Sequence, residues 1–207
     1  GEYLRGEPLI RFRTTFGLSF LDADGDGWID LLACNGHIDP QIERRSQATT
    51  YRQQPLLYRN EQGRFQEATA GTGLDGLPPI LGRGMAVGDY DNDGRPDVLL
   101  AENGGPARLL RNETPLAGAW LGVRLKGVRS NRDGYGAVVK LEAGGLSQRR
   151  WVRSGVSYLS ENDPRALFGV PAGAGPTRLE VRWPSGAVSR VEGPAVGQYH
   201  TLTEPAN

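Results

Sequence analysis

The stretch DADGDGWID at residues 22–30 recurs as DYDNDGRPD at residues 89–97, and this repetition is the strongest indication of the fold in the sequence. Both copies place aspartate at positions 1, 3, 5 and 9 and glycine at position 6. Alternate residues of a tight loop aim their carboxylates at one point, which suits calcium, a hard cation that takes roughly six to eight oxygen ligands. The sequence therefore predicts one Ca2+ ion in each loop.

Each predicted site combines four carboxylates with one backbone carbonyl. The residue at position 7 supplies the carbonyl, so its side chain is free to differ between the copies. The predicted ligands are Asp22, Asp24, Asp26, the carbonyl of Trp28 and Asp30 in the first loop, and Asp89, Asp91, Asp93, the carbonyl of Arg95 and Asp97 in the second. The alternative is a pair of plain Asp/Gly turns, but such crowded carboxylates repel one another unless a cation neutralises them.

An EF-hand shares the first part of this pattern but also requires a glutamate at position 12 and a helix on each side. Position 12 is Ala33 in the first copy and Leu100 in the second. The runs that follow, WIDLLAC and RPDVLLA, are short, apolar and typical of strands. Each loop is therefore predicted to lead into a β-strand.

The amino-acid composition limits which classes of protein this chain can belong to. The 207 residues include 30 glycines and 14 prolines, which favours many short strands and turns over long helices. Lys and Arg total 24, as do Asp and Glu, so the net charge offers no argument for nucleic acid or an anionic membrane. No apolar run is long enough to span a membrane. Cys34 is the single cysteine and is predicted to be a small buried residue.

Residues 1–114 repeat a unit larger than the loop. A glycine-containing apolar strand precedes each copy, as FGLSFLD and GMAVGDYD, and an apolar strand ending in Asn-Gly follows, as LLACNG and LLAENGG. PLLYRN and ARLLRN come next. This recurrence predicts about two propeller blades, with an insertion near residues 38–53. A closed propeller needs about four to eight blades, and the chain opens without an initiator methionine, so we expect part of a longer protein.

Residues 115–207 carry a different pattern. Apolar residues alternate with polar ones at 121–126, 139–142 and 178–183, as expected of strands with one buried face. The Pro-Ser-Gly sequence at residues 184–186 predicts a hairpin. This half is therefore predicted to be an antiparallel β-sandwich, and the whole chain a mostly β protein of two domains.

The quoted segments resemble two known families. FLDADGDGWIDLLACNGH and VGDYDNDGRPDVLLAENGG resemble the calcium-loop blades of FG-GAP/VCBS β-propellers. WLGVRLKG, SNRDGYGA, RSGVSYLSENDP, LFGV and LEVRWPSG, in that order, resemble the ASPIC/UnbV domain. The combination is similar to the cartilage acidic protein-like family and its bacterial relatives. The resemblance implies a secreted, periplasmic or cell-surface protein, here as its C-terminal part.

Three polar groups of the second half are candidate contact sites. The basic cluster could bind a glycan or an anion, or it could consist simply of exposed arginines on a strand. The first polar group could contact a ligand or only form a turn, and the last could contact a ligand or cap the propeller. The groups are Asn131, Arg132 and Asp133; Arg149, Arg150 and Arg153 with Trp151; and Ser157, Ser160, Glu161, Asn162 and Asp163.

Catalytic signatures are absent from the sequence. There is no GxSxG, HExxH, P-loop or dinucleotide glycine motif. His37, near Asp39, is interpreted as a surface residue, with catalysis or metal ligation as the alternative. The leading hypothesis is a calcium-binding interaction or adhesion-type protein whose partner is a protein or glycan. The alternative, implied by bacterial relatives in enediyne-type pathways, is an enzyme-like biosynthetic protein with a propeller cavity that has a concave, largely apolar lining.

Overall fold

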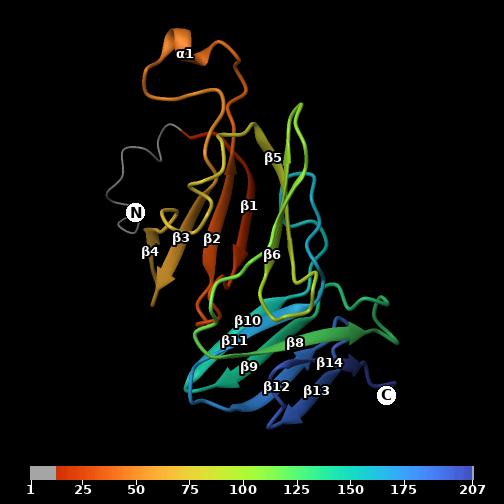
Figure 1. Cartoon of the computed structure of the whole chain (residues 1–207). Helices are drawn as coiled ribbons and strands as arrows, with labels where there is room; N and C mark the ends of the chain where they lie inside the picture. Colours follow the sequence, from red (N-terminus) through yellow and green to blue (C-terminus); the bar gives the residue numbers. More distant parts are fainter. Residues whose placement is uncertain (1–12, 207) are drawn as a thin grey trace.

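The computed structural model describes residues 13–206, and antiparallel strands dominate them (Figure 1). The parts of the two predicted domains at residues 1–12 and 207 lie outside the described residues. The first blade sheet runs in the order β1 (Thr15–Leu21), β2 (Asp30–Asn35), β3 (Leu56–Glu61) and β4 (Arg64–Glu67). The second blade sheet runs in the order β5 (Gly82–Gly88), β6 (Asp97–Glu102) and β7 (Arg108–Leu110).

Each acidic loop joins the first two strands of its blade sheet. Leu21 pairs with Asp30 across the first loop, and Gly88 pairs with Asp97 across the second. The strands predicted to follow the loops are therefore confirmed as β2 and β6. The short helix α1 (Ile42–Arg45) lies within the predicted insertion, far from both loops (Figure 1).

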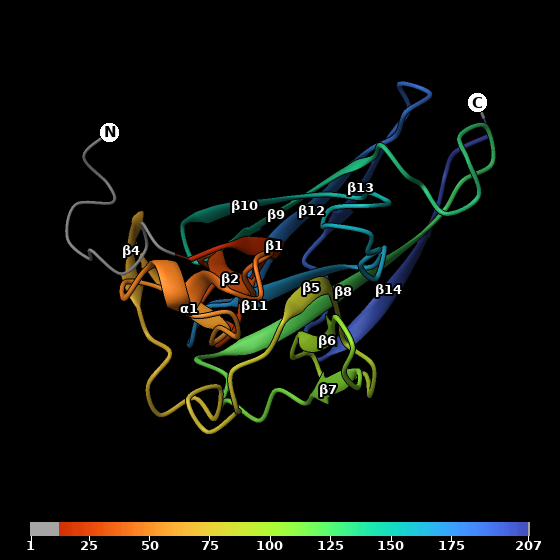
Figure 2. The same ribbon diagram turned by 90° about the horizontal axis from the view of Figure 1, so that it is seen from above.

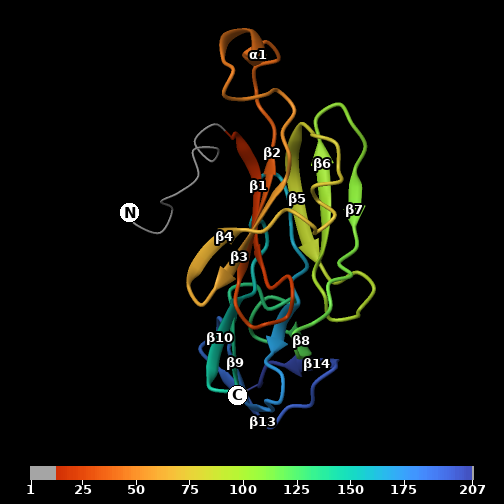
Figure 3. The same ribbon diagram turned by 60° about the vertical axis from the view of Figure 1, so that its left-hand side comes forward.

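The two blade sheets pack against each other and stand side by side (Figure 3). A Cβ atom at Gly17 would lie 2.8 Å from the Cβ of Met85, so the sheets approach too closely there for a larger residue. Their shared core holds apolar side chains from both sheets and from Ile80, just before β5; the others are Leu21, Leu32, Cys34, Leu57, Met85, Val98 and Leu100. Cys34 is fully buried, as the sequence predicts, and burial raises the pKa of its thiol to about 11.

The C-terminal half (residues 115–206) forms two further sheets around its own core. One has the order β10 (Leu146–Trp151), β9 (Val138–Ala143), β12 (Pro176–Arg182) and β13 (Val188–Glu192). The other has the order β11 (Ala166–Val170), β8 (Ala119–Lys126) and β14 (Gln198–Thr203). One pairing departs from the antiparallel prediction, because β14 runs parallel to β8. The chain crosses from β13 to the other sheet, and a crossover connection permits parallel pairing.

The two halves meet along the first strands of both blades, seen from above in Figure 2. β1 and β5 are edge strands, so they carry backbone N–H groups without a strand partner on one side. The segment between β10 and β11 supplies side-chain oxygens that accept from these groups: Ser157 Oγ from Leu18 at 3.0 Å, Ser160 Oγ from Met85 at 3.0 Å, and Asn162 Oδ1 from Val87 at 2.9 Å. This segment therefore covers the edges of β1 and β5.

No helix among residues 13–206 is long and apolar enough to cross a membrane.

Candidate metal centres and the groove between them

Both loops owe their shape to the glycine at position 6. Gly27 has a φ of 92° and Gly94 a φ of 86°, in the left-handed region that glycine tolerates best. The N–H of Gly27 donates to Asp22 Oδ2 at 3.0 Å, and the N–H of Gly94 donates to Asp89 Oδ2 at 2.9 Å. The turn therefore holds the aspartate at position 1 against the loop.

The loops bring carboxylates together at two points. Asp22, Asp24 and Asp30 offer oxygens within 4.8 Å of one another, and so do Asp89, Asp91 and Asp97. In each case these are positions 1, 3 and 9 of the repeat. An all-oxygen, anionic donor set of this kind suits a hard divalent cation.

One oxygen in each cluster is left without a hydrogen-bond partner. Asp22 Oδ1 and Asp91 Oδ1 are buried and accept no hydrogen bond from the described residues. A buried polar atom of this kind is costly unless something satisfies it, and a cation in the cluster would do so. The residues present therefore fit a bound calcium ion.

Positions 5 and 7 serve the turn in this structure. Asp26 Oδ1 accepts from the N–H of Trp28 at 2.7 Å, and Asp93 Oδ1 accepts from the N–H of Arg95 at 2.9 Å. Arg95 also forms an ion pair with Asp93. Ligation by the side chains at position 5 and the carbonyls at position 7 stays a prediction.

The aspartate at position 9 ties each loop to the third strand of its sheet or the residues after it. Asp30 Oδ1 accepts from the N–H of Asn60 at 2.8 Å, and Asp97 Oδ1 accepts from the N–H of Asn112 at 2.8 Å. The Oδ2 atom of each aspartate accepts a hydrogen bond from a backbone N–H inside the loop, that of Ala23 in the first copy and that of Tyr90 in the second.

The arginine before each of these asparagines contacts position 3. Arg59 forms an ion pair with Asp24, and Arg111 Nε donates to Asp91 Oδ2 at 2.8 Å. The recurrence of the Arg-Asn pair in PLLYRN and ARLLRN was visible in the sequence, but its role was not predicted. The repeat unit of each site therefore includes the Arg-Asn pair as well as the nine-residue loop.

Burial makes the metal-free carboxylates hard to ionise. Burial raises the pKa of Asp22 to about 6, with Arg150 opposing the shift and Asp26 adding to it. The pKa values of Asp26, Asp30 and Asp97 are also raised, first by burial and also by neighbouring aspartates. A bound cation would favour the ionised form of these buried carboxylates.

The C-terminal half contacts the aspartate at position 1 of both loops. The N–H of Gly169 in β11 donates to Asp22 Oδ2 at 3.2 Å, and Arg150 Nη2 lies 3.9 Å from the same oxygen. In the second loop, the Tyr199 hydroxyl donates to Asp89 Oδ2 at 2.7 Å, and Arg165 donates to the Asp89 carbonyl. These contacts between the two halves of the chain were not predicted from the sequence.

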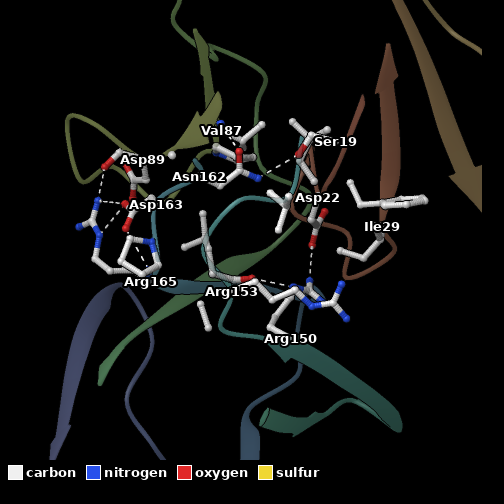
Figure 4. Close-up of a pocket in the computed structure, with 18 of the residues that line it drawn as sticks. Ser19, Asp22, Ile29, Val87, Asp89, Arg150, Arg153, Asn162, Asp163 and Arg165 are labelled. Carbon is white, nitrogen blue, oxygen red and sulfur yellow. Dashed lines mark hydrogen bonds and ion pairs between the residues drawn. The ribbon is translucent and has the colours of Figure 1, made fainter. Parts of the chain in front are cut away.

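A groove of about 850 Å³ lies between these two contact points. Figure 4 shows Asp22 with Arg150 on one side, Asp89 with Arg165 on the other, and Asn162 between Val87 and Ser19. Asn162 Nδ2 donates to Ser19 Oγ at 3.1 Å, so this residue links both blade sheets. The walls come from β1, β10 and the segment that joins β10 to β11.

The remaining candidates from the sequence have structural partners. Asn131 exchanges hydrogen bonds with the backbone of Tyr135, and exposed Arg132 pairs with Asp133, which is turn chemistry. Nδ1 of His37 accepts from the N–H of Asp39 at 3.0 Å. Glu161 accepts a hydrogen bond from the Tyr135 hydroxyl at 2.7 Å. Arg149 and Arg153 flank Trp151 at the groove.

Comparison with known families gives two matches along the chain. The family model described as FG-GAP-like repeat matches residues 22–100, which include both acidic loops. The model described as ASPIC and UnbV matches residues 127–207. A comparison with curated proteins gave no match.

Proposed function

Because the chain joins an FG-GAP-like repeat to an ASPIC and UnbV domain, we propose that it is a calcium-dependent interaction protein of the extracellular type. Repeats of the first kind are typical of extracellular or surface β-propeller proteins. The observation that carries the proposal is the contact of the C-terminal half with position 1 of both loops. Two ions would then hold the blades and the C-terminal half together as one unit.

The ligand sets follow from the clusters. Asp22, Asp24 and Asp30 would hold one ion and Asp89, Asp91 and Asp97 the other, joined by the side chains and carbonyls predicted at positions 5 and 7. Bound calcium supplies positive charge to carboxylates whose burial disfavours ionisation. Arg59 and Arg111 each engage an oxygen of the aspartate at position 3 and would orient that side chain.

We also propose that the chain has two domains, with the boundary between residues 114 and 115. Each half has its own buried core, which supports separate domains. The connecting residues pack on the first loop, since the N–H of Ala117 donates to the Asp24 carbonyl at 2.8 Å. A Cβ atom at Gly25 would lie 2.7 Å from Leu116 Cδ2. The connection therefore leads directly into the first candidate metal centre.

The groove supports binding more than catalysis. It has the concave, partly apolar lining that the enzyme-like alternative requires, but neither histidine of the chain lines it. Its three carboxylates belong to the loops, at Asp22 and Asp89, or pair with Arg165, at Asp163. Acid–base catalysis needs a proton-transfer group that faces the substrate, whereas we assign Asp22 and Asp89 to calcium, and Asp163 pairs with Arg165. A protein, glycan or small-molecule partner fits the groove better.

Calorimetry tests the proposal. Calcium added to metal-stripped chain should bind at about two sites, and Asp24→Ala and Asp91→Ala should each remove one. Asp133→Ala is the matched control, because Asp133 is a partly exposed aspartate that pairs with Arg132 in a turn outside both loops. Absence of any binding heat at millimolar calcium in the unaltered chain would contradict the proposal.

A further inference from the structure

The groove exposes apolar side chains on both of its walls. β1 contributes Phe20, which is 62% exposed, and Leu18, which is 41% exposed. The C-terminal half contributes Trp151 at 53% and Tyr158 at 45% exposure. The ring of Tyr158 also packs edge-on against Phe16, with 5.1 Å between ring centroids. Exposed apolar side chains that gather in a concavity are typical of a ligand site.

Two further cations, Arg149 and Arg153, lie at the same groove. Arg149 and Arg153 lie over the ring of Trp151, with guanidinium carbons 5.9 and 5.0 Å from its centroid. Within residues 13–206, neither forms an ion pair with a carboxylate. The other two arginines of the groove are engaged, Arg150 near Asp22 and Arg165 with Asp163. The side of the groove next to Trp151 is therefore positively charged and aromatic.

Calcium would increase this positive character. The groove contains four arginines and three aspartates, and two of those aspartates, Asp22 and Asp89, belong to the candidate metal centres. A bound ion at each centre neutralises both carboxylates, which leaves the arginines with little opposing charge. To this extent the inference rests on the proposed function.

We propose that the groove binds an organic anion with a flat apolar ring system and a carboxylate or sulfonate group. The apolar rings pack against Phe20, Leu18 and Tyr158, and the acid group meets the guanidinium groups of Arg149 and Arg153. Guanidinium groups recognise carboxylates through paired hydrogen bonds, and loss of such charge-assisted bonds weakens binding about tenfold or more. A volume of about 850 Å³ lies in the range of small-molecule sites.

Titration calorimetry with 2-naphthoate tests the proposal on the calcium-loaded chain. Naphthalene-2-methanol has the same ring without the charge, and acetate has the charge without the ring. We expect 2-naphthoate to bind more tightly than either. The double variant Arg149→Gln and Arg153→Gln should weaken 2-naphthoate about tenfold or more and leave naphthalene-2-methanol unchanged.

Two further variants separate the ring from the charge. Phe20→Ala should weaken both naphthyl compounds, because the ring of Phe20 packs against the naphthyl group in both. Arg124→Gln, at an exposed arginine of β8 without an ion pair in the described chain, is the matched control and should change neither.

Three results would overturn the proposal. The first is no binding of 2-naphthoate at millimolar concentration, and the second is equal binding by the unaltered chain and the double arginine variant. The third is a concentration-dependent dimer in light scattering that Phe20→Ala disrupts, since a second copy would then occupy the groove. A calcium titration on the same samples keeps the outcomes separate, because loss of calcium binding alone contradicts the proposed function.

Discussion

The first and second loops share an internal plan but differ in how the C-terminal half contacts them. Inside each loop, the glycine N–H, the aspartate at position 9 and the Arg-Asn pair make equivalent contacts. Outside, Asp22 receives a backbone N–H from Gly169, whereas Asp89 receives the Tyr199 hydroxyl. The repeat therefore specifies the candidate ion site, and unrelated residues of the C-terminal half specify the contact with that loop.

Removal of calcium should have the largest effect, because it acts on both loops at once. An ion at about a hundred times its dissociation constant stabilises the folded state by roughly 2.7 kcal/mol, so two ions contribute about 5 kcal/mol. For a chain of this size the melting temperature should fall by about 10–20 °C on chelation. Thermal melts with calcium and with chelator measure this fall in melting temperature, and an unchanged melt would mean that both loops are plain turns.

A change of pH should alter the stability of the metal-free chain. The pKa of Asp22 is about 6 in the folded state, against an ordinary value of 3.8, so the folded state holds its proton more tightly. Its stabilising effect is complete below about pH 4 and is lost as the pH rises through about 6, on the order of 3 kcal/mol. The metal-free chain should therefore be more stable at pH 5 than at pH 7.

Asp22→Asn supplies the control for this pH effect, because the amide does not titrate. Denaturant unfolding of the metal-free variant at both pH values should show a smaller difference than the unaltered chain. The same difference in both proteins would show that Asp22 is not the group responsible.

The contact to the first loop can be broken with a single methyl group. A Cβ atom at Gly169 would lie 2.4 Å from the Gly25 carbonyl oxygen and 2.5 Å from Asp22 Oδ2. In a chain that carries Asp91→Ala, and so retains only the first site, Gly169→Ala should weaken calcium binding tenfold or more. Gly175→Ala is the matched control, since a Cβ there meets nothing within 4 Å. Equal weakening by both alanines would contradict a specific contact.

The contact to the second loop depends on one hydroxyl group. Tyr199→Phe removes the donor to Asp89 Oδ2 and should weaken calcium binding about tenfold in a chain with Asp24→Ala, since a hydrogen bond to a charged group contributes about 1.5–3 kcal/mol. Tyr135→Phe removes a similar bond to Glu161, which lies outside both loops, and should have no effect. Unchanged calcium affinity in the Tyr199 variant would show that this hydroxyl does not support calcium binding.

Much of the blade architecture could be predicted because it is local in sequence. The aspartates, the glycine and the strands after each loop lie within a few residues of one another, so spacing alone identifies them. The Arg-Asn pair recurred visibly, yet its contact with position 3 depends on the return of the third strand. Asp89 and Tyr199 lie 110 positions apart, and no periodic pattern links such residues. The parallel pairing of β14 with β8 was missed for the same reason.

Hydrogen exchange tests most directly whether calcium holds the two halves together. With calcium, the amides of β11 and of the segment that covers β1 and β5 should exchange more slowly than in chelator, because Gly169 N–H donates to Asp22 and Asp163 N–H donates to the Val87 carbonyl. The β12–β13 hairpin, which forms no part of the groove, is the internal control and should not change. Calcium binding without any added protection in β11 or the covering segment would contradict the account.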